Sequence, residues 1–308
     1  MDWTNLVASP RNYALWDQDV DAVVNSRGEG AHAKEVARGD RFEFGKNWAR
    51  FLATLSEERI AFAVNSLCAM LSVTTLAGKT FVDVGSGSGL FSLAARRLGA
   101  RVHSFDYDPH SVACTTELRQ RFYPGDDTWS IAEASVLDAT YLGTLNRFDV
   151  VYSWGVLHHT GHMWQALDNV GALVAARGKL FIAIYNDQGS RSRRWLLAKR
   201  IYNRLPGPLK APWAVLAITP TEFKAAASAL LTGRLGAYVR GWRQPDPTRG
   251  MNRWRDVIDW VGGYPFEVAS PDEIFDFYHE RGFVLSKLLC KGAGFGCVQY
   301  VFENPGLQ

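Results

Sequence analysis

Three glycines and two aspartates form the pattern in this sequence that is most directly tied to chemistry. The glycines alternate with serines as Gly85-Ser-Gly-Ser-Gly89, Asp83 stands just before them, and Asp106 ends the next apolar segment. A glycine turn lets the backbone approach a ligand that any Cβ would block. A carboxylate after the following strand can accept hydrogen bonds from both hydroxyls of a ribose. The pattern therefore predicts a site for a nucleotide-like cofactor.

The spacing of these residues restricts the ligand. A dinucleotide site typically reads G-x-G-x-x-G, which places a pyrophosphate at the helix N-terminus, whereas Gly89 comes one residue early. Asp83 would repel a pyrophosphate but could attract an ammonium group. A ligand with a ribose, an α-amino group and no phosphate is S-adenosylmethionine. A nicotinamide-dependent oxidoreductase is correspondingly disfavoured.

The elements that must position these residues alternate between strand and helix. Strands are predicted at residues 80–84, 101–105, 129–132, 149–153 and 180–184, and helices at residues 90–98 and 109–122. This alternation predicts a parallel sheet covered by helices on both faces. Right-handed crossovers then place the carboxyl ends of the strands, and with them the cofactor, along one edge.

At this point the chain resembles the class I S-adenosylmethionine-dependent methyltransferases. The glycine turn and Asp106 are similar to their first two cofactor motifs, Ala134-Ser-Val-Leu-Asp138 to the third, and residues 148–159 and 178–185 to their fourth and fifth strands. The resemblance covers residues 78–186. Within this class, the chain resembles the ubiquinone-pathway O-methyltransferases and natural-product methyltransferases. It implies a Rossmann-like, seven-stranded, mostly parallel sheet with an antiparallel last strand.

The resemblance also assigns cofactor contacts. Asp83 and the glycine turn would hold the methionine part, Asp106 the ribose, and Asp138 the adenine. Structural roles compete with each acid, because Asp83 could cap a turn, Asp106 could cap the helix near Pro109, and Asp138 could be a loop acid. Asp108 is the rival for the helix cap. The predicted cofactor residues are Asp83, Gly85, Ser86, Gly87, Gly89, Asp106, Tyr107, Leu137, Asp138 and Trp154.

Histidines cluster directly after the predicted fourth strand, at His158, His159 and His162. We expect no metal there, because adjacent histidines in a loop seldom face one centre and no carboxylate nearby completes a ligand set. Either His158 or His159 could act as the general base, since imidazole titrates near neutral pH. Packing against the cofactor is the competing role.

Four regions are expected along the chain: an N-terminal helical cap (1–77), the cofactor-binding core (78–186), a basic helical insertion that forms a lid (187–267), and a helix with two strands that complete the sheet (268–308). A helix is predicted over residues 57–71, and Ser270-Pro-Asp-Glu273 predicts another that begins with a capping box. The prolines at 206, 208, 212 and 220 predict that the lid is broken into short pieces after residue 205.

Charge is concentrated in the lid. Residues 191–255 hold fourteen Lys or Arg against two acids, a net charge of +12, although the whole chain carries only +3. This segment is expected to meet something negative: the rest of the protein, an anionic acceptor, a membrane surface or RNA.

Aromatic and polar residues around the predicted edge are the candidate acceptor contacts. They are Phe44, Lys46, Trp48, Tyr185, Asn186, Trp260 and Tyr264. Ordinary packing on the sheet competes with this role for the aromatic rings, and capping of the fifth strand competes with it for Tyr185 and Asn186.

These observations favour methyl transfer from S-adenosylmethionine to an oxygen, nitrogen or carbon of a small or lipid-linked, anionic acceptor. An RNA methyltransferase that uses the basic insertion is the first alternative. A non-catalytic, cofactor-binding subunit of a complex is the second. Without an 18-residue apolar run or a basic N-terminal leader, the sequence predicts a cytoplasmic protein with no transmembrane segment; it does not indicate an oligomeric state.

Overall fold

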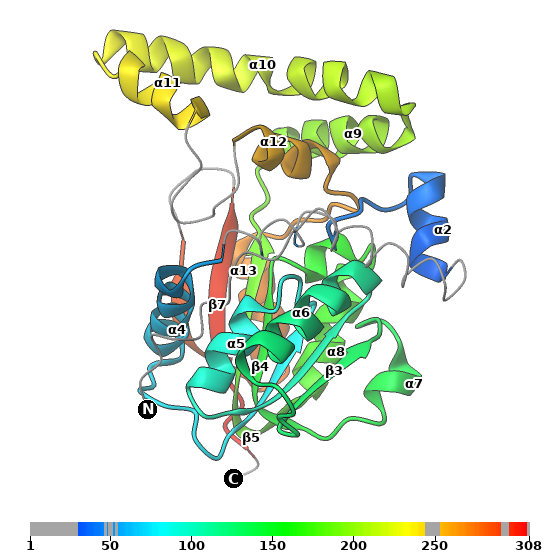
Figure 1. Cartoon of the computed structure of the whole chain (residues 1–308), viewed down its shortest axis with the longest axis vertical. Helices are drawn as coiled ribbons and strands as arrows, with labels where there is room; N and C mark the ends of the chain where they lie inside the picture. Colours follow the sequence, from blue (N-terminus) through cyan, green and yellow to red (C-terminus); the bar gives the residue numbers. More distant parts are fainter. Residues whose placement is uncertain are drawn as a thin grey trace.

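The computed structural model describes residues 30–45, 48, 52, 55–243, 253–290 and 296–306. Among these residues, seven strands form one sheet in the order β3-β2-β1-β4-β5-β7-β6 (Figure 1). The strands β1 to β5 are parallel, and β7 runs antiparallel to both β5 and β6. The predicted Rossmann-like sheet is confirmed. Its strands are β1 (Thr80–Val84), β2 (Arg101–Asp106), β3 (Trp129–Glu133), β4 (Phe148–Trp154), β5 (Val174–Tyr185), β6 (Val284–Leu289) and β7 (Cys297–Glu303).

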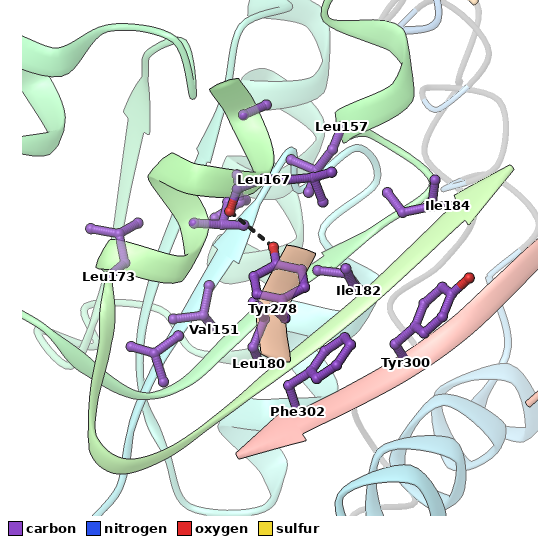
Figure 2. Packing of buried hydrophobic residues seen from close by; sticks show 14 of the residues in the cluster. Val151, Leu157, Leu167, Leu173, Leu180, Ile182, Ile184, Tyr278, Tyr300 and Phe302 are labelled. Atoms are coloured by element: carbon purple, nitrogen blue, oxygen red, sulfur yellow. Dashed lines mark hydrogen bonds between the residues drawn. The ribbon is translucent and has the colours of Figure 1, made fainter. Parts of the chain in front are cut away.

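Helices bury apolar side chains on both faces of the sheet. On one face lie α4 (Glu57–Leu71), α5 (Leu90–Arg97) and α6 (Pro109–Phe122); on the other lie α8 (Met163–Ala172) and α13 (Pro271–His279). Figure 2 shows the second core, in which the Tyr278 hydroxyl donates a hydrogen bond of 2.9 Å to the carbonyl of Leu167. This bond satisfies the one polar atom that Tyr278 brings into an apolar core.

Several predicted elements are confirmed at their bounds. The helices predicted over residues 57–71 and 109–122 are α4 and α6, and Ser270 and Glu273 form the predicted capping box of α13. The strand β5 is longer than expected because it begins at Val174. Arg177, with a φ of 62°, and Lys179 interrupt the apolar run there, so the sequence pattern hides the first half of the strand.

A layer of four helices lies across the edge at which β4 and β5 end, at the top of Figure 1. They are α9 (Ser190–Arg204), α10 (Gly207–Leu231), α11 (Leu235–Arg243) and α12 (Arg253–Gly262). The layer has a small core of its own, built on Tyr202, Ala214, Ile218, Val257 and Val261. The short helix α2 (Ala31–Arg38) lies to one side of the same edge.

The prediction that prolines break the lid into short pieces is wrong. Pro212 and Pro220 lie inside α10, a single helix of 25 residues. Proline removes the hydrogen bond to the carbonyl four residues earlier, and those carbonyls belong to Pro208 and Leu216, which are exposed and can bind water instead. By length and composition, α10 is also the one helix in the described ranges that could cross a membrane.

Candidate functional site

The glycine turn between β1 and α5 is held from several sides. Gly85, Gly87 and Gly89 all have positive φ, at 76°, 55° and 77°, in the left-handed region that other residues rarely adopt. A Cβ on Gly89 would lie 2.9 Å from the Cα of Thr115, and one on Gly85 would overlap the Val156 side chain. The turn therefore needs glycine for its packing as well as for its backbone conformation.

Asp106, at the carboxyl end of β2, reaches the glycine turn. One carboxylate oxygen accepts a hydrogen bond of 2.9 Å from the Gly87 amide, and the other accepts one of 2.9 Å from the Asp108 amide. Burial, together with the nearby charge of Asp108, raises the pKa of Asp106 to about 7. Asp108 caps α6 through the amide of His110. The competing role for Asp106 as a helix cap is thus filled by Asp108.

The side chain of Asp83 points into the protein. Its carboxylate accepts a hydrogen bond of 2.5 Å from the hydroxyl of Ser92 in α5, and that hydroxyl lies 2.7 Å from the hydroxyl of Ser104. Burial raises the pKa of Asp83 to about 7. In this arrangement the carboxylate fixes α5 against the sheet just behind the glycine turn, and Ser92 is a partner that sequence reasoning missed.

The predicted adenine contacts lie beyond β3. Asp138 caps α7 (Ala139–Leu142) by accepting a hydrogen bond of 3.1 Å from the Tyr141 amide. Leu137 is partly buried against the core, and its amide donates to the Ser135 hydroxyl at 3.1 Å. Trp154 ends β4 with an exposed side chain. Asp138 therefore has a structural role whether or not it also meets a ligand.

The N-terminal segment folds over the edge formed by Tyr107 and Asp108. The Tyr107 hydroxyl donates to Glu35 of α2 at 3.0 Å, and the Arg41 guanidinium lies 4.9 Å from the centre of the Tyr107 ring. Asp108 accepts a hydrogen bond of 2.8 Å from the Gly45 amide. The described part of residues 1–77 therefore packs against the carboxyl end of β2; its role as a cap over the cofactor stays a prediction.

Trp48 continues this packing to the glycine turn. Its indole lies so close to Gly87 that an added Cβ would be 3.2 Å from it. Of the other acceptor candidates in this segment, Phe44 packs at 5.0 Å on the ring of His159, whereas Lys46 lies outside the described residues.

The histidine pair lies in a short 3-10 helix, Leu157–His159, after β4. The ring nitrogen Nδ1 of His159 lies 2.5 Å from the carbonyl oxygen of Pro265, so it carries the proton and donates. Burial lowers the pKa of His159 to about 3, which leaves a neutral ring whose Nε2 is an acceptor. His158 is fully buried with no hydrogen-bond partner on either ring nitrogen, and burial lowers its pKa well below the ordinary value.

Tyr185 joins the histidines to the lid. Its ring centre lies 3.9 Å from that of His158, 5.5 Å from that of His159 and 5.5 Å from that of Trp260 in α12. Beside Tyr185 and Trp260 is a small hollow of about 10 Å³, partly open to solvent, which has room for about one water molecule. Its walls are formed by Tyr185, Asn186, Gln188, Ser192, Trp195, Trp260, Phe266 and Gly296. Three of the predicted acceptor contacts, Tyr185, Asn186 and Trp260, therefore line one hollow.

Tyr264 lies outside this group of rings. Its carbonyl accepts a hydrogen bond of 2.8 Å from the Phe42 amide, and its ring lies 6.0 Å from the Arg200 guanidinium. Among the described residues, no group of three or more His, Cys, Asp or Glu side chains could hold a metal ion.

Lys199 is the functional candidate that sequence reasoning missed. This lysine of α9 is fully buried, its ammonium donates to the carbonyl of Trp260, and it lies 4.4 Å and 4.8 Å from the ring centres of Trp260 and Phe266. Burial lowers its pKa to about 7. A signal was available, because Trp195, Lys199 and Tyr202 are spaced to share one face of a helix.

The comparisons with known proteins agree with this architecture. A family described as "Methyltransferase domain" matches residues 46–217, more than half of the chain. The ribosomal protein L11 methyltransferases of Bacillus cereus (strain AH820) and Bacillus anthracis are 33% identical in an alignment of 117 positions, and the match covers 33% of this chain and 37% of theirs. The match spans little more than a third of the length of these relatives.

Matches to solved structures have low sequence identity. One chain of the complex between the Haloferax volcanii Trm112 methyltransferase activator and a methyltransferase has a TM-score of 0.50 and 14% identity, covering 87% of this chain and 99% of its own. The magnesium protoporphyrin IX methyltransferase of Synechocystis PCC 6803, solved with bound S-adenosylmethionine, has a TM-score of 0.47 and 9% identity, covering 96% of this chain and 98% of its own.

Proposed function

The chain belongs to the methyltransferase-domain family and uses S-adenosylmethionine, and we propose that its acceptor is a small anionic molecule, free or lipid-linked, held beneath α9 and α12. The observation that carries this proposal is the buried Lys199 beside the aromatic hollow at Tyr185. A buried cation is costly; the Asp259 carboxylate offsets part of that cost through its charge, and the Lys199 ammonium donates to the Trp260 carbonyl. An anionic acceptor admitted by a movement of α12 would compensate the remaining charge and pack on the ring of either Trp260 or Tyr185, whose planes are 84° apart.

The residues at the glycine turn fit the cofactor. A Cβ could not be added at Gly85 or Gly89 without a clash, and each oxygen of Asp106 accepts only one amide hydrogen bond. A carboxylate oxygen can accept a second, so Asp106 would take the two ribose hydroxyls while it continues to hold the turn. When bound, S-adenosylmethionine supplies an activated methyl group on a sulfonium. Asp83 would then hold Ser92 behind the turn and would make no direct contact with the cofactor.

His159 is the proposed partner of the acceptor's reactive group. Its Nδ1–H is fixed on the carbonyl of Pro265, so Nε2 presents a lone pair from an oriented ring. Because a pKa of about 3 makes this ring a weak base, we assign it to an oxygen or nitrogen acceptor whose own proton is acidic. The acceptor's X–H would hydrogen-bond to Nε2, and its proton would pass to the imidazole as the methyl group leaves the sulfonium sulfur, now a neutral thioether, and bonds to X; the imidazolium would then return the proton to water.

Binding of the acceptor can be tested without knowing its identity. Protein saturated with S-adenosylhomocysteine is mixed with the anionic small-molecule fraction of a cell extract and ultrafiltered, and the retained compounds are identified by mass spectrometry. Wild-type protein and the Lys224→Met control, which removes an exposed lysine of the same lid, should retain the same compound, and Lys199→Met should release it. Equal retention by Lys199→Met, or no retained compound, would reject the proposed acceptor site.

A further inference from the structure

The outer face of α10 is apolar along its whole length. Leu209, Leu216, Phe223 and Leu230 recur every seven residues and are 52%, 63%, 74% and 64% exposed. Residues seven apart lie on one side of an α-helix. The opposite side, represented by Ile218, is buried against α9 and α12. A contiguous exposed stripe of this kind marks an interaction surface.

Among the described residues of α10, α11 and their flanks, the charges are almost all positive. The only acid in α10 and α11, Glu222, is turned toward the protein, where it accepts hydrogen bonds from Arg253 at 2.9 Å and from the Tyr238 hydroxyl at 2.8 Å. From residue 204 to residue 242, the exposed charged side chains are Arg204, Lys224, Arg234 and Arg240. An apolar stripe bordered by cations matches the surface of an anionic lipid bilayer, which offers acyl chains beneath a layer of negative charge.

We propose that α10 and α11 dock this protein on an anionic membrane, with α10 lying in the plane of the interface and its leucine and phenylalanine stripe inserted among the lipids. This docking is independent of which acceptor is methylated. In Figure 1, α10 is the outermost helix of the molecule, on the far side of α9 and α12 from the sheet, and α11 packs beneath its C-terminal end.

The packing of α10 favours lying on the membrane over crossing it. The indole of Trp213 donates a hydrogen bond of 3.0 Å to the Ala198 carbonyl of α9, and Ala214 and Ile218 are buried in the core of the lid. To span a bilayer, α10 would have to leave this core and place Glu222 in hydrocarbon, away from Arg253. Pro212 and Pro220 also leave carbonyls that need a donor, which headgroups and interfacial water provide.

A second copy of the chain is a poorer occupant. In a twofold interface the same patch meets itself, so the cations Lys224, Arg234 and Arg240 of one copy would face the same cationic patch of the other, with no exposed acid in α10 or α11 to pair them. RNA would be attracted by these cations, but it offers no partner for four exposed leucine and phenylalanine side chains.

Sedimentation with lipid vesicles tests the proposal on the full-length protein. Wild type should sediment with phosphatidylcholine vesicles that contain about 30% phosphatidylglycerol, less with pure phosphatidylcholine vesicles, and less at high salt. The double substitution Leu216→Glu with Phe223→Glu should weaken binding by about tenfold or more. The control is Phe62→Glu in α4, which changes a side chain that is 60% exposed but far from the stripe.

Two further measurements make the result decisive. The affinity for S-adenosylmethionine and the unfolding midpoint should be the same in all three proteins, which shows that the double variant is folded. Failure of the folded wild type to sediment at low salt, or equal sedimentation by the double variant, would overturn the proposal. So would a wild-type dimer, seen by analytical ultracentrifugation, that the double substitution converts to a monomer, because the stripe would then be a subunit interface.

Discussion

The Gly87 amide donates a hydrogen bond of 2.9 Å to the carboxylate of Asp106, and this bond ties the turn after β1 to the end of β2. The acid predicted to hold the ribose therefore also fixes the backbone that would lie against the rest of the cofactor. A change at Asp106 should affect cofactor affinity in two ways: it removes an acceptor for the ribose, and it releases the turn.

Asp106→Asn should weaken S-adenosylmethionine binding by about 10- to 100-fold, as expected for loss of hydrogen bonds to a charged group. The amide nitrogen of Asn would face either the Gly87 or the Asp108 amide, donor against donor. Calorimetric titration measures the effect. The matched control is Asp149→Asn at the opposite end of the sheet, where Asp149 also accepts a backbone amide, from Thr80 at 2.9 Å. Equal affinities for Asp106→Asn and Asp149→Asn would rule out the ribose role.

Lys199→Met should make the free energy of unfolding less dependent on pH. The pKa of Lys199 is about 7 in the folded protein and ordinarily 10.5, so between these values the unfolded chain binds more protons. The free energy of unfolding of the wild type should therefore rise between pH 7 and pH 10.5. Below pH 7 the buried Lys199 is charged, which destabilises the folded state, and above pH 7 it loses this charge. Urea unfolding below and above pH 7 tests this; the same pH dependence in both proteins would show that Lys199 is not the buried titrating cation.

The buried histidines should make the protein less stable in acid. The pKa of His159 falls from 6.5 to about 3 through burial, so the unfolded state binds more protons between these values. Stability should fall as the pH drops from 6.5 toward 3. His159→Asn should lessen this fall while an amide hydrogen still reaches the Pro265 carbonyl. If the stability of His159→Asn falls as steeply in acid as that of the wild type, His159 is not a neutral, buried group in the folded protein.

The same His159→Asn variant tests catalysis. Once the acceptor is known, kcat should fall by about 100- to 10,000-fold, as for removal of a general base, while the affinity for S-adenosylmethionine stays unchanged. A wild-type kcat would show that His159 only packs beside Phe44 and Tyr185.

Gly89→Ala should destabilise the protein by about 1–3 kcal/mol or more, because its φ is 77° and the new Cβ would lie 2.9 Å from the Cα of Thr115. The control is Gly125→Ala, which has a similar φ of 73° but nothing within 4 Å of the new Cβ. The difference between the two losses, measured by urea unfolding, reports the crowding alone. Equal losses would mean that the turn can move away from α6.

The sheet and its flanking helices were predictable because their signals are local. Buried parallel strands appear as short apolar runs, such as residues 80–84, and Asp108 and Ser270 mark helix starts through their own side chains. Because Asp108 caps α6, Asp106 remains available for the cofactor site, as predicted from the sequence.

The lid and the acceptor hollow were less predictable because they depend on tertiary contacts. The continuity of α10 through Pro212 and Pro220 depends on which carbonyls face water, and the burial of Lys199 depends on α12 lying over it. Asp83 is a further example. Its position in the motif does not reveal that the Ser92 hydroxyl, in the first turn of α5, donates a hydrogen bond to its carboxylate.

The most direct test of the account is transfer of labelled methyl from S-adenosylmethionine into a cell extract, followed by separation of the RNA, protein, lipid and small-molecule fractions. With wild-type protein, the label should enter an anionic compound of the small-molecule or lipid fraction, and it should not do so with Lys199→Met. Label that accumulates in RNA or protein, or no transfer by a protein that binds S-adenosylmethionine, would contradict the proposed function.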